Sequence, residues 1–185
     1  RIGLIGHSEG GIIAPMIAAE SPDVAFIVLM AGTGVTGGEV LVRQGELLLE
    51  ANGAPEEVIR ENTRVQKILF EIMKTTPDDA AAETKAREAL SGLDPALRDA
   101  AYGQLKTAFS AWMRYFVAYD PRPALAKVKC PVLAVNGEKD LQVSARQNLP
   151  EIGKALRDGG NRDFRTVELP GLNHMLQTCK TGSVA

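Results

Sequence analysis

Hydrophobic positions along the chain fall into four short runs that predict β-strands. Three of the runs are apolar almost without interruption, which is the pattern of parallel strands covered on both faces. The fourth alternates apolar and polar residues, as a half-exposed edge strand does. The continuous runs are residues 1–6, 24–31 and 131–136, and the alternating run is residues 164–169.

Two segments beside these runs have helical character. Residues 10–20 link the first two runs and have the right length for a crossover helix. Residues 144–158 follow the third run and carry Leu149, Ile152 and Leu156 at helical spacing. Because strands and helices alternate along the chain, the pattern predicts an α/β fold built on a parallel sheet.

The middle of the chain has a different pattern. Between Thr36 and Tyr119 we find no convincing strand, only helical periodicity interrupted by capping residues, prolines and glycines. So long a helical stretch between two strands exceeds a crossover and predicts an inserted subdomain. We therefore expect an α/β core over residues 1–35 and 120–185, and a helical cap over residues 36–119. The expected helices cover residues 40–51, 55–73 and 76–90, then Asp94 to about Lys106, followed by the aromatic segment 112–119.

The strongest chemical signal is a G-x-S-x-G pentapeptide that begins at Gly6 and follows the first predicted strand directly. This pattern is typical of a nucleophile elbow, in which a sharp strand-to-helix turn projects the serine hydroxyl above the sheet edge. The serine here is Ser8, and we expect side chains in place of Gly6 and Gly10 to collide with the neighbouring strand and helix. The backbone N–H of Glu9 could donate to a developing oxyanion. The alternative is a tight glycine-rich turn without a catalytic role.

A serine nucleophile needs a base, and the chain contains two histidines, His7 and His174. His7 is adjacent to Ser8, and consecutive side chains at such a turn diverge, so we expect His7 not to reach the serine hydroxyl. His174 lies in the loop after the fourth predicted strand, at the sheet edge where Ser8 should emerge. We therefore predict His174 as the base. The alternative is a solvated or structural loop histidine.

The acid that orients the base should follow another strand at the same edge. Asp140 lies just past the third predicted strand, and its carboxylate would hold the imidazole tautomer and stabilise the imidazolium. Glu138 is a local competitor, and Asp140 could instead cap the next helix. The order Ser8, Asp140, His174 is the chain order of α/β-hydrolase triads.

Three segments of the chain are similar to the active-site motifs of bacterial α/β-hydrolase-fold serine esterases: residues 6–11, 136–140 and 169–174. The resemblance is closest to the serine-aminopeptidase-like and dienelactone-hydrolase-like carboxylesterases that carry a helical cap. Residues 112–123 also resemble the return from cap to core in that subgroup. The similarity covers essentially the whole chain. It implies hydrolysis of carboxylic esters through an acyl-enzyme, without a cofactor or a metal.

By motif match, the resemblance assigns Ser8 as nucleophile, Asp140 as acid and His174 as base. The sequence also departs from the family, which places further strands and helices before the elbow strand and a final helix after the histidine loop. Here the elbow strand begins at Arg1. We therefore expect the chain to be the C-terminal portion of a larger hydrolase. Its N-terminal half would complete the fold and supply a second oxyanion donor, so we expect little esterase activity from this chain alone.

Aromatic and methionine side chains in the cap and the core loops could line an acyl pocket, because their shape and polarisability suit acyl chains. They could equally join cap to core. The Glu9 carboxylate could meet a polar or cationic substrate group, or pair with a surface lysine. The candidate lining residues are Trp112, Phe116, Met30, Leu141 and Met175, with Met113 and Tyr115 beside them.

We accordingly expect a carboxylesterase acting on small to medium acyl esters. Two rival enzymes would use the same triad, an acyl-peptide hydrolase and an acyl-CoA thioesterase, because all three reactions share a tetrahedral intermediate. A hydrolase-fold module that binds a ligand or a partner without catalysis is a further alternative, although a binding module needs no serine–acid–histidine trio.

The composition argues against several classes of binding partner. The 185 residues include 21 basic and 23 acidic side chains, a net charge of −2 that argues against a nucleic-acid surface. The longest apolar run, residues 24–31, is too short to span a bilayer. Cys130 and Cys179 form no CxxC pair, which argues against a disulfide scaffold or a zinc ribbon. We favour a reducing cytoplasm, although a signal peptide preceding Arg1 would be equally compatible with these cysteines.

Overall fold

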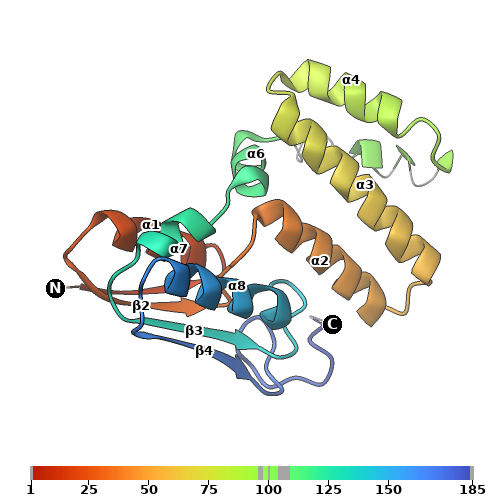
Figure 1. Ribbon diagram of the computed structural model, residues 1–185. Coiled ribbons are helices and arrows are strands. Elements are labelled where there is room, and N and C mark those ends of the chain that lie inside the picture. Colours follow the sequence, from red (N-terminus) through yellow and green to blue (C-terminus); the bar gives the residue numbers. More distant parts are fainter. Residues whose placement is uncertain (1, 96–97, 100, 104–108, 184–185) are drawn as a thin grey trace.

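Figure 1 shows the computed structural model, which describes residues 2–95, 98–99, 101–103 and 109–183. Its strands form one parallel sheet in the order β1-β2-β3-β4, so the predicted α/β fold class is confirmed. Each strand matches a predicted run to within one residue at either end. The strands are β1 (Ile2–His7), β2 (Val24–Met30), β3 (Val132–Gly137) and β4 (Phe164–Leu169).

Three helices cover one face of the sheet. α1 (Gly10–Glu20) crosses from β1 to β2, and α8 (Ala145–Asp158) crosses from β3 to β4, both as predicted. Between them lies α7 (Arg122–Lys127), which the sequence analysis missed because six residues are too few to show a helical period. The three helices pack side by side, since α7 contacts both α1 and α8.

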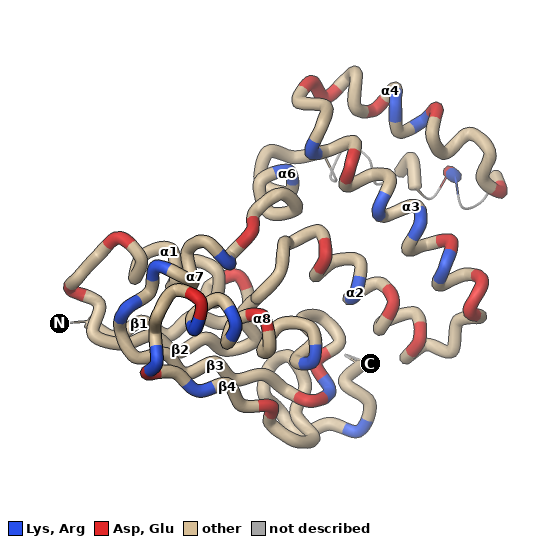
Figure 2. Tube along the Cα trace, in the orientation of Figure 1, with Lys and Arg blue, Asp and Glu red and all other residues tan. Residues whose placement is uncertain are grey.

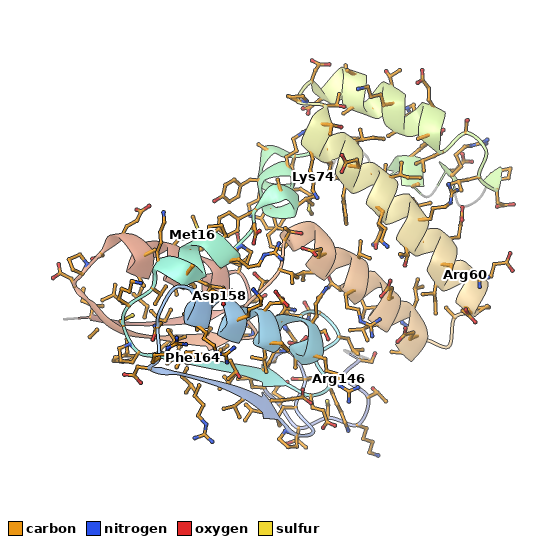
Figure 3. All side chains as sticks on the ribbon, in the orientation of Figure 1. Met16, Arg60, Lys74, Arg146, Asp158 and Phe164 are labelled. Carbon is orange, nitrogen blue, oxygen red and sulfur yellow. The ribbon has the colours of Figure 1, made fainter. Side chains whose placement is uncertain are left out.

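The core lies between these helices and the sheet. Ile27 and Leu29 of β2 and Ile152 of α8 are almost completely buried there. At one point α8 approaches β4 closely, because a Cβ on Gly153 would lie only 3.3 Å from the Phe164 ring. Figure 3 shows Phe164 beneath α8.

The opposite face of the sheet is bare in the described part of the chain. Ile5, Phe26 and Leu133, which point to this side, are 70%, 45% and 38% exposed. The expectation that the strands are covered on both faces is therefore wrong for these residues. A continuous apolar run indicates that both faces avoid water, but it does not say which segment covers each face.

The remaining helices lie together beyond the helical layer of the core (Figure 1), and we call them the cap helices. Their positions agree with the predicted helices, except that the first begins three residues earlier and the one predicted from residue 76 begins three residues later, at Asp79. Thr36 explains this earlier start, because it forms a reciprocal capping box with Glu39. The domain boundaries at residues 35/36 and 119/120 stay a prediction. The cap helices are α2 (Gly37–Ala51), α3 (Glu56–Thr75), α4 (Asp79–Ala89) and α6 (Ala111–Ala118).

The helix expected from Asp94 to about Lys106 lies partly outside the described residues. Residues 95, 98–99 and 101–103, which are described, are helical. Elsewhere in the cap, a small cluster around Met73, Ala86 and Val117 is buried between α3, α4 and α6.

Candidate active site

Ser8 sits in the tight turn between β1 and α1. Its φ of +55° is a conformation that costs energy for any residue except glycine, and such strain is typical of functional turns. The turn is anchored because the Ser8 N–H donates to the Met30 carbonyl oxygen at 2.9 Å. The backbone therefore has the geometry expected of a nucleophile elbow.

The glycines around Ser8 have different functions. A Cβ on Gly6 would lie 2.0 Å from the Gly10 carbonyl oxygen, so no side chain fits at position 6. Gly10 itself has open space around its Cα, and the expectation that a side chain would collide there is wrong. The second tight position is Gly11, where a Cβ would lie 2.6 Å from the Cα of Gly32. The close approach is thus between α1 and the segment after β2.

The backbone N–H of Glu9 points out of the start of α1. The first N–H groups of a helix have no partner within the helix, and they carry the positive end of its dipole. Within the described part of the chain, the Glu9 N–H makes no hydrogen bond. It is therefore free to donate to an oxyanion, as the elbow geometry requires.

Asp140 lies in the loop after β3 and is only 3% exposed. Its Oδ1 accepts hydrogen bonds from the backbone N–H groups of Gln142 (2.8 Å) and Val143 (2.9 Å). Its Oδ2 faces His174 Nδ1 at 2.8 Å. The alternative role as a helix cap does not hold, because Ser144 is the residue that precedes α8.

Glu138, the competing carboxylate, serves the histidine loop in another way. Its Oε2 accepts a hydrogen bond from the Gly171 N–H at 2.8 Å, and the Lys139 N–H donates to the Leu172 carbonyl oxygen at 2.9 Å. The two loops are in such close contact that a Cβ on Gly137 would lie 2.3 Å from that same carbonyl oxygen. Glu138 thus stabilises the backbone of the loop that carries His174 and does not pair with the imidazole.

His174 is 7% exposed and held on two sides. Its pairing with Asp140 favours the tautomer that carries the proton on Nδ1. The lone pair of Nε2 is then available to accept a proton. On the other side, His7 Nε2 donates to the His174 carbonyl oxygen at 2.8 Å, and the two rings lie 4.8 Å apart. The sequence analysis missed this role of His7, and the only available signal was a second histidine inside the elbow motif.

The structure brings Asp140 and His174 together directly, and it brings Ser8 near them through His7. No hydrogen bond joins Ser8 Oγ to His174 Nε2 among the described residues. Catalytic hydrogen bonds often tighten only when substrate is bound, so the triad geometry is compatible with this arrangement.

The expected lining residues occupy different positions. Trp112 and Phe116 stack at 5.3 Å, and Trp112 Nε1 donates to Glu9 Oε1 at 2.9 Å. Met30 ends β2 beside His7, to which it is paired across the sheet. The Glu9 carboxylate therefore meets an indole instead of the surface lysine considered above.

The other lining residues are less engaged with the elbow. Met175 is 60% exposed in the histidine loop. Leu141 packs beside the C-terminal segment, since a Cβ on Gly182 would lie 3.1 Å from its Cγ. Met113 lines a cavity of about 550 Å³ between α2, α3 and α6, and Ser8 is not among the residues around that cavity.

Other site types find little support. Over the residues that the structure describes, no group of three or more histidine, cysteine or acidic side chains could hold a metal ion. Cys130 and Cys179 are free thiols, and burial raises the pKa of the Cys130 thiol above its usual value. No helix in the described ranges is long and apolar enough to cross a bilayer.

Comparison with known proteins places this geometry in a family. Residues 1–179 match the alpha/beta hydrolase family. The chain belongs to this family. No curated protein matches.

Several solved hydrolase structures are similar to this chain. An alpha/beta fold family hydrolase from Bacillus anthracis is 19% identical with a TM-score of 0.51, and the match covers 94% of this chain and 61% of that one. An esterase from Pyrococcus furiosus is 13% identical with a TM-score of 0.44, over 92% and 45%. A meta-cleavage product hydrolase variant from Pseudomonas fluorescens is 15% identical with a TM-score of 0.46, over 94% and 58%. The chain thus spans less than two thirds of the length of each of these three proteins.

Proposed function

We propose that this alpha/beta hydrolase cleaves carboxylic esters of small to medium acyl chains through an acyl-enzyme on Ser8. The observation that carries the proposal is the buried pairing of Asp140 Oδ2 with His174 Nδ1 at 2.8 Å, in a loop tied by His7 to the elbow that holds Ser8. A buried carboxylate held by two backbone N–H groups and one imidazole is the arrangement that orients a general base.

In the first half of the proposed reaction, Ser8 Oγ attacks the ester carbonyl carbon while His174 Nε2 takes the hydroxyl proton. Asp140 stabilises the resulting imidazolium, and the Glu9 N–H donates to the oxyanion. The intermediate collapses as the C–O bond breaks, and the imidazolium gives its proton to the departing alkoxide. Water, activated by the same imidazole, then hydrolyses the acyl-enzyme and restores the serine hydroxyl.

We propose that Trp112, Phe116 and Met30 contribute to the substrate side. Trp112 donates a hydrogen bond to Glu9 of the elbow, Phe116 stacks on Trp112, and Met30 is paired with His7 across the sheet. Met175 and Leu141 remain candidates from the flanking loops. An acyl-peptide hydrolase or thioesterase would use the same residues and differ only in the leaving group. A panel of matched esters, peptides and thioesters separates the three reactions.

We also propose that a segment outside these 185 residues covers the bare sheet face around Ile5, Phe26 and Leu133. This segment would belong to a longer natural form of the protein. The support is the exposure of these apolar side chains and the greater length of the matching structures. Tests of activity should therefore use that longer form.

A fluorophosphonate probe tests the proposal, because it reacts covalently only with an activated serine. We expect a single adduct on Ser8, no adduct in Ser8→Ala, and a labelling rate lower by a factor of about 10² or more in His174→Ala. Ser144→Ala is a matched control that should label normally, since the Ser144 side chain makes no capping hydrogen bond. Labelling at another serine, or labelling that His174→Ala leaves unchanged, would contradict the proposal and favour a non-catalytic binding module.

A further inference from the structure

The carboxylate of Glu9 lies one residue beyond the candidate nucleophile. Its Oε1 accepts one hydrogen bond, from Trp112 Nε1 at 2.9 Å, and the side chain is otherwise exposed. Among the described residues, Glu9 takes part in no ion pair. The nearest strong cation on the same cap helix as Trp112 is Arg114, which is engaged by Asp79 and by backbone carbonyl oxygens of Met73 and Thr76.

Trp112 presents an aromatic surface next to this carboxylate. Phe116 stacks on one face of the indole at an interplanar angle of 9°, yet the side chain is 52% exposed. With Phe116 on one face, the exposed area of the indole is left to its other face and its edges. The indole N–H holds the edge of the ring against Glu9, so the ring lies next to this carboxylate, one residue beyond Ser8 in the chain.

The negative charge of Glu9 has a consequence for the chemistry. Attack by Ser8 develops a second negative charge on the substrate oxygen, close to the backbone N–H of Glu9 itself. The carboxylate of the same residue carries a like charge, and like charges repel each other, with only partial screening by water at an exposed site. A positive charge on the substrate would remove this repulsion, and an aromatic face beside a carboxylate is a favourable place for it.

We propose that Glu9 and Trp112 form a subsite for a cationic group, so that the preferred substrates are esters carrying an ammonium group close to the scissile carbonyl. The carboxylate attracts the charge, and the exposed indole surface accepts the methyl or methylene groups around the nitrogen. This inference rests on the proposed esterase function and adds the substrate class to it. A neutral ester would use the same triad but would leave the Glu9 charge uncompensated.

The test compares two esters of one carboxylic acid that have the same shape and differ in charge, the choline ester and the 3,3-dimethylbutyl ester. We expect kcat/KM to favour the choline ester by about tenfold, within the range expected for a cation against an aromatic face. Added salt should reduce the preference, because the attraction is electrostatic and exposed.

Two variants localise the effect. Glu9→Gln removes the charge but keeps a carbonyl oxygen for the Trp112 N–H, so the preference should fall to near unity. The ratio of the two kcat/KM values cancels any change in general activity. Glu20→Gln, at the exposed far end of α1, is the matched control and should keep the full preference. Equal rates for the two esters, or a preference that survives Glu9→Gln, would overturn the proposal.

A binding measurement separates this inference from the proposed function. Trp112 is the single tryptophan of this chain, so the fluorescence lost in Trp112→Phe reports on the subsite directly. Titration with choline should change that fluorescence saturably, whereas 3,3-dimethylbutanol should not, and Glu9→Gln should abolish the response. If Ser8 is not labelled by the fluorophosphonate, the esterase proposal fails while this titration still decides the subsite. If choline does not change the Trp112 fluorescence, the subsite proposal is overturned, whether or not the protein has esterase activity.

Discussion

The core and the cap helices differ in how deeply their side chains are buried and in the kind of polar interactions they make. In the core, side chains such as Leu29 and Leu156 are completely buried, and buried polar groups such as Asn161 make specific hydrogen bonds to backbone. In the cap, α3 and α4 carry charged residues along much of their length (Figure 2), with exposed ion pairs such as Arg87–Glu83. Such pairs add little stability.

This difference indicates where each task of the proposed enzyme would be placed. Proton transfer needs groups fixed in a dry environment, and Asp140 and His174 are both held in the core by buried contacts. Among the described residues, the cap reaches the elbow by one side-chain hydrogen bond, from Trp112 to Glu9. We infer that the core determines the reaction and that the cap determines the substrate. Three predictions test that division, beginning with the largest effect.

Replacing Asp140 with Asn should have the largest effect on activity and a small effect on structure. The amide cannot hold the Nδ1–H tautomer of His174 or stabilise its imidazolium, and we expect turnover to fall by about 10²- to 10⁴-fold. Steady-state kinetics with an ester substrate and far-ultraviolet circular dichroism measure the two effects. Glu138→Gln is the matched control and should lose no more than about tenfold, because an amide oxygen still accepts from the Gly171 N–H. Comparable losses in both variants would contradict the assignment of Asp140.

Two adjacent glycines should differ in stability when each is changed to alanine. In Gly11→Ala the new Cβ would meet the backbone of Gly32 at 2.6 Å, and we expect a loss of about 2–3 kcal/mol in the free energy of unfolding. In Gly10→Ala the new methyl meets open space in the first turn of α1, so stability should stay within about 1 kcal/mol or rise. Denaturant titration of both variants decides the point, and equal losses would mean that α1 does not pack as described.

Arg114→Met should loosen the cap without disturbing the core. The guanidinium, only 15% exposed, donates to the Met73 and Thr76 carbonyl oxygens and pairs with Asp79, so it joins α6 to the junction of α3 and α4. We expect a loss of about 1–2 kcal/mol, confined to the cap. Amide hydrogen exchange should speed up in α3 and α4 and stay unchanged in β2 and β3. Faster exchange throughout the sheet would show that cap and core unfold as one unit.

Much of the fold follows from local pattern. The three continuous apolar runs predict β1, β2 and β3, and the alternating run predicts β4 as an edge strand. Asp140 and His174 could be predicted because each follows a strand at the same edge of the sheet. The bare sheet face could not be predicted, since a strand's own sequence does not name the segment that covers it.

Contacts between distant residues leave no local signal. His7 reaches the His174 backbone across 167 positions and Trp112 reaches Glu9 across 103, so neither pairing appears in any sequence window. Gly10 and Gly11 show that a local motif can also point to the wrong residue. The motif spacing pointed to Gly10, but the crowded position is Gly11, because packing against Gly32 depends on how α1 crosses the segment after β2.

The bond between His7 and the His174 carbonyl has a kinetic consequence. The elbow forms from consecutive residues around Ser8, and the Asp140–His174 pair joins residues that are 34 positions apart. Joining the two pieces requires β2 to pair with β3 across the whole helical insertion. Contacts of such high sequence separation form slowly. During synthesis the elbow therefore leaves the ribosome long before its partners, and in refolding we expect the site to be the last part of the molecule to assemble.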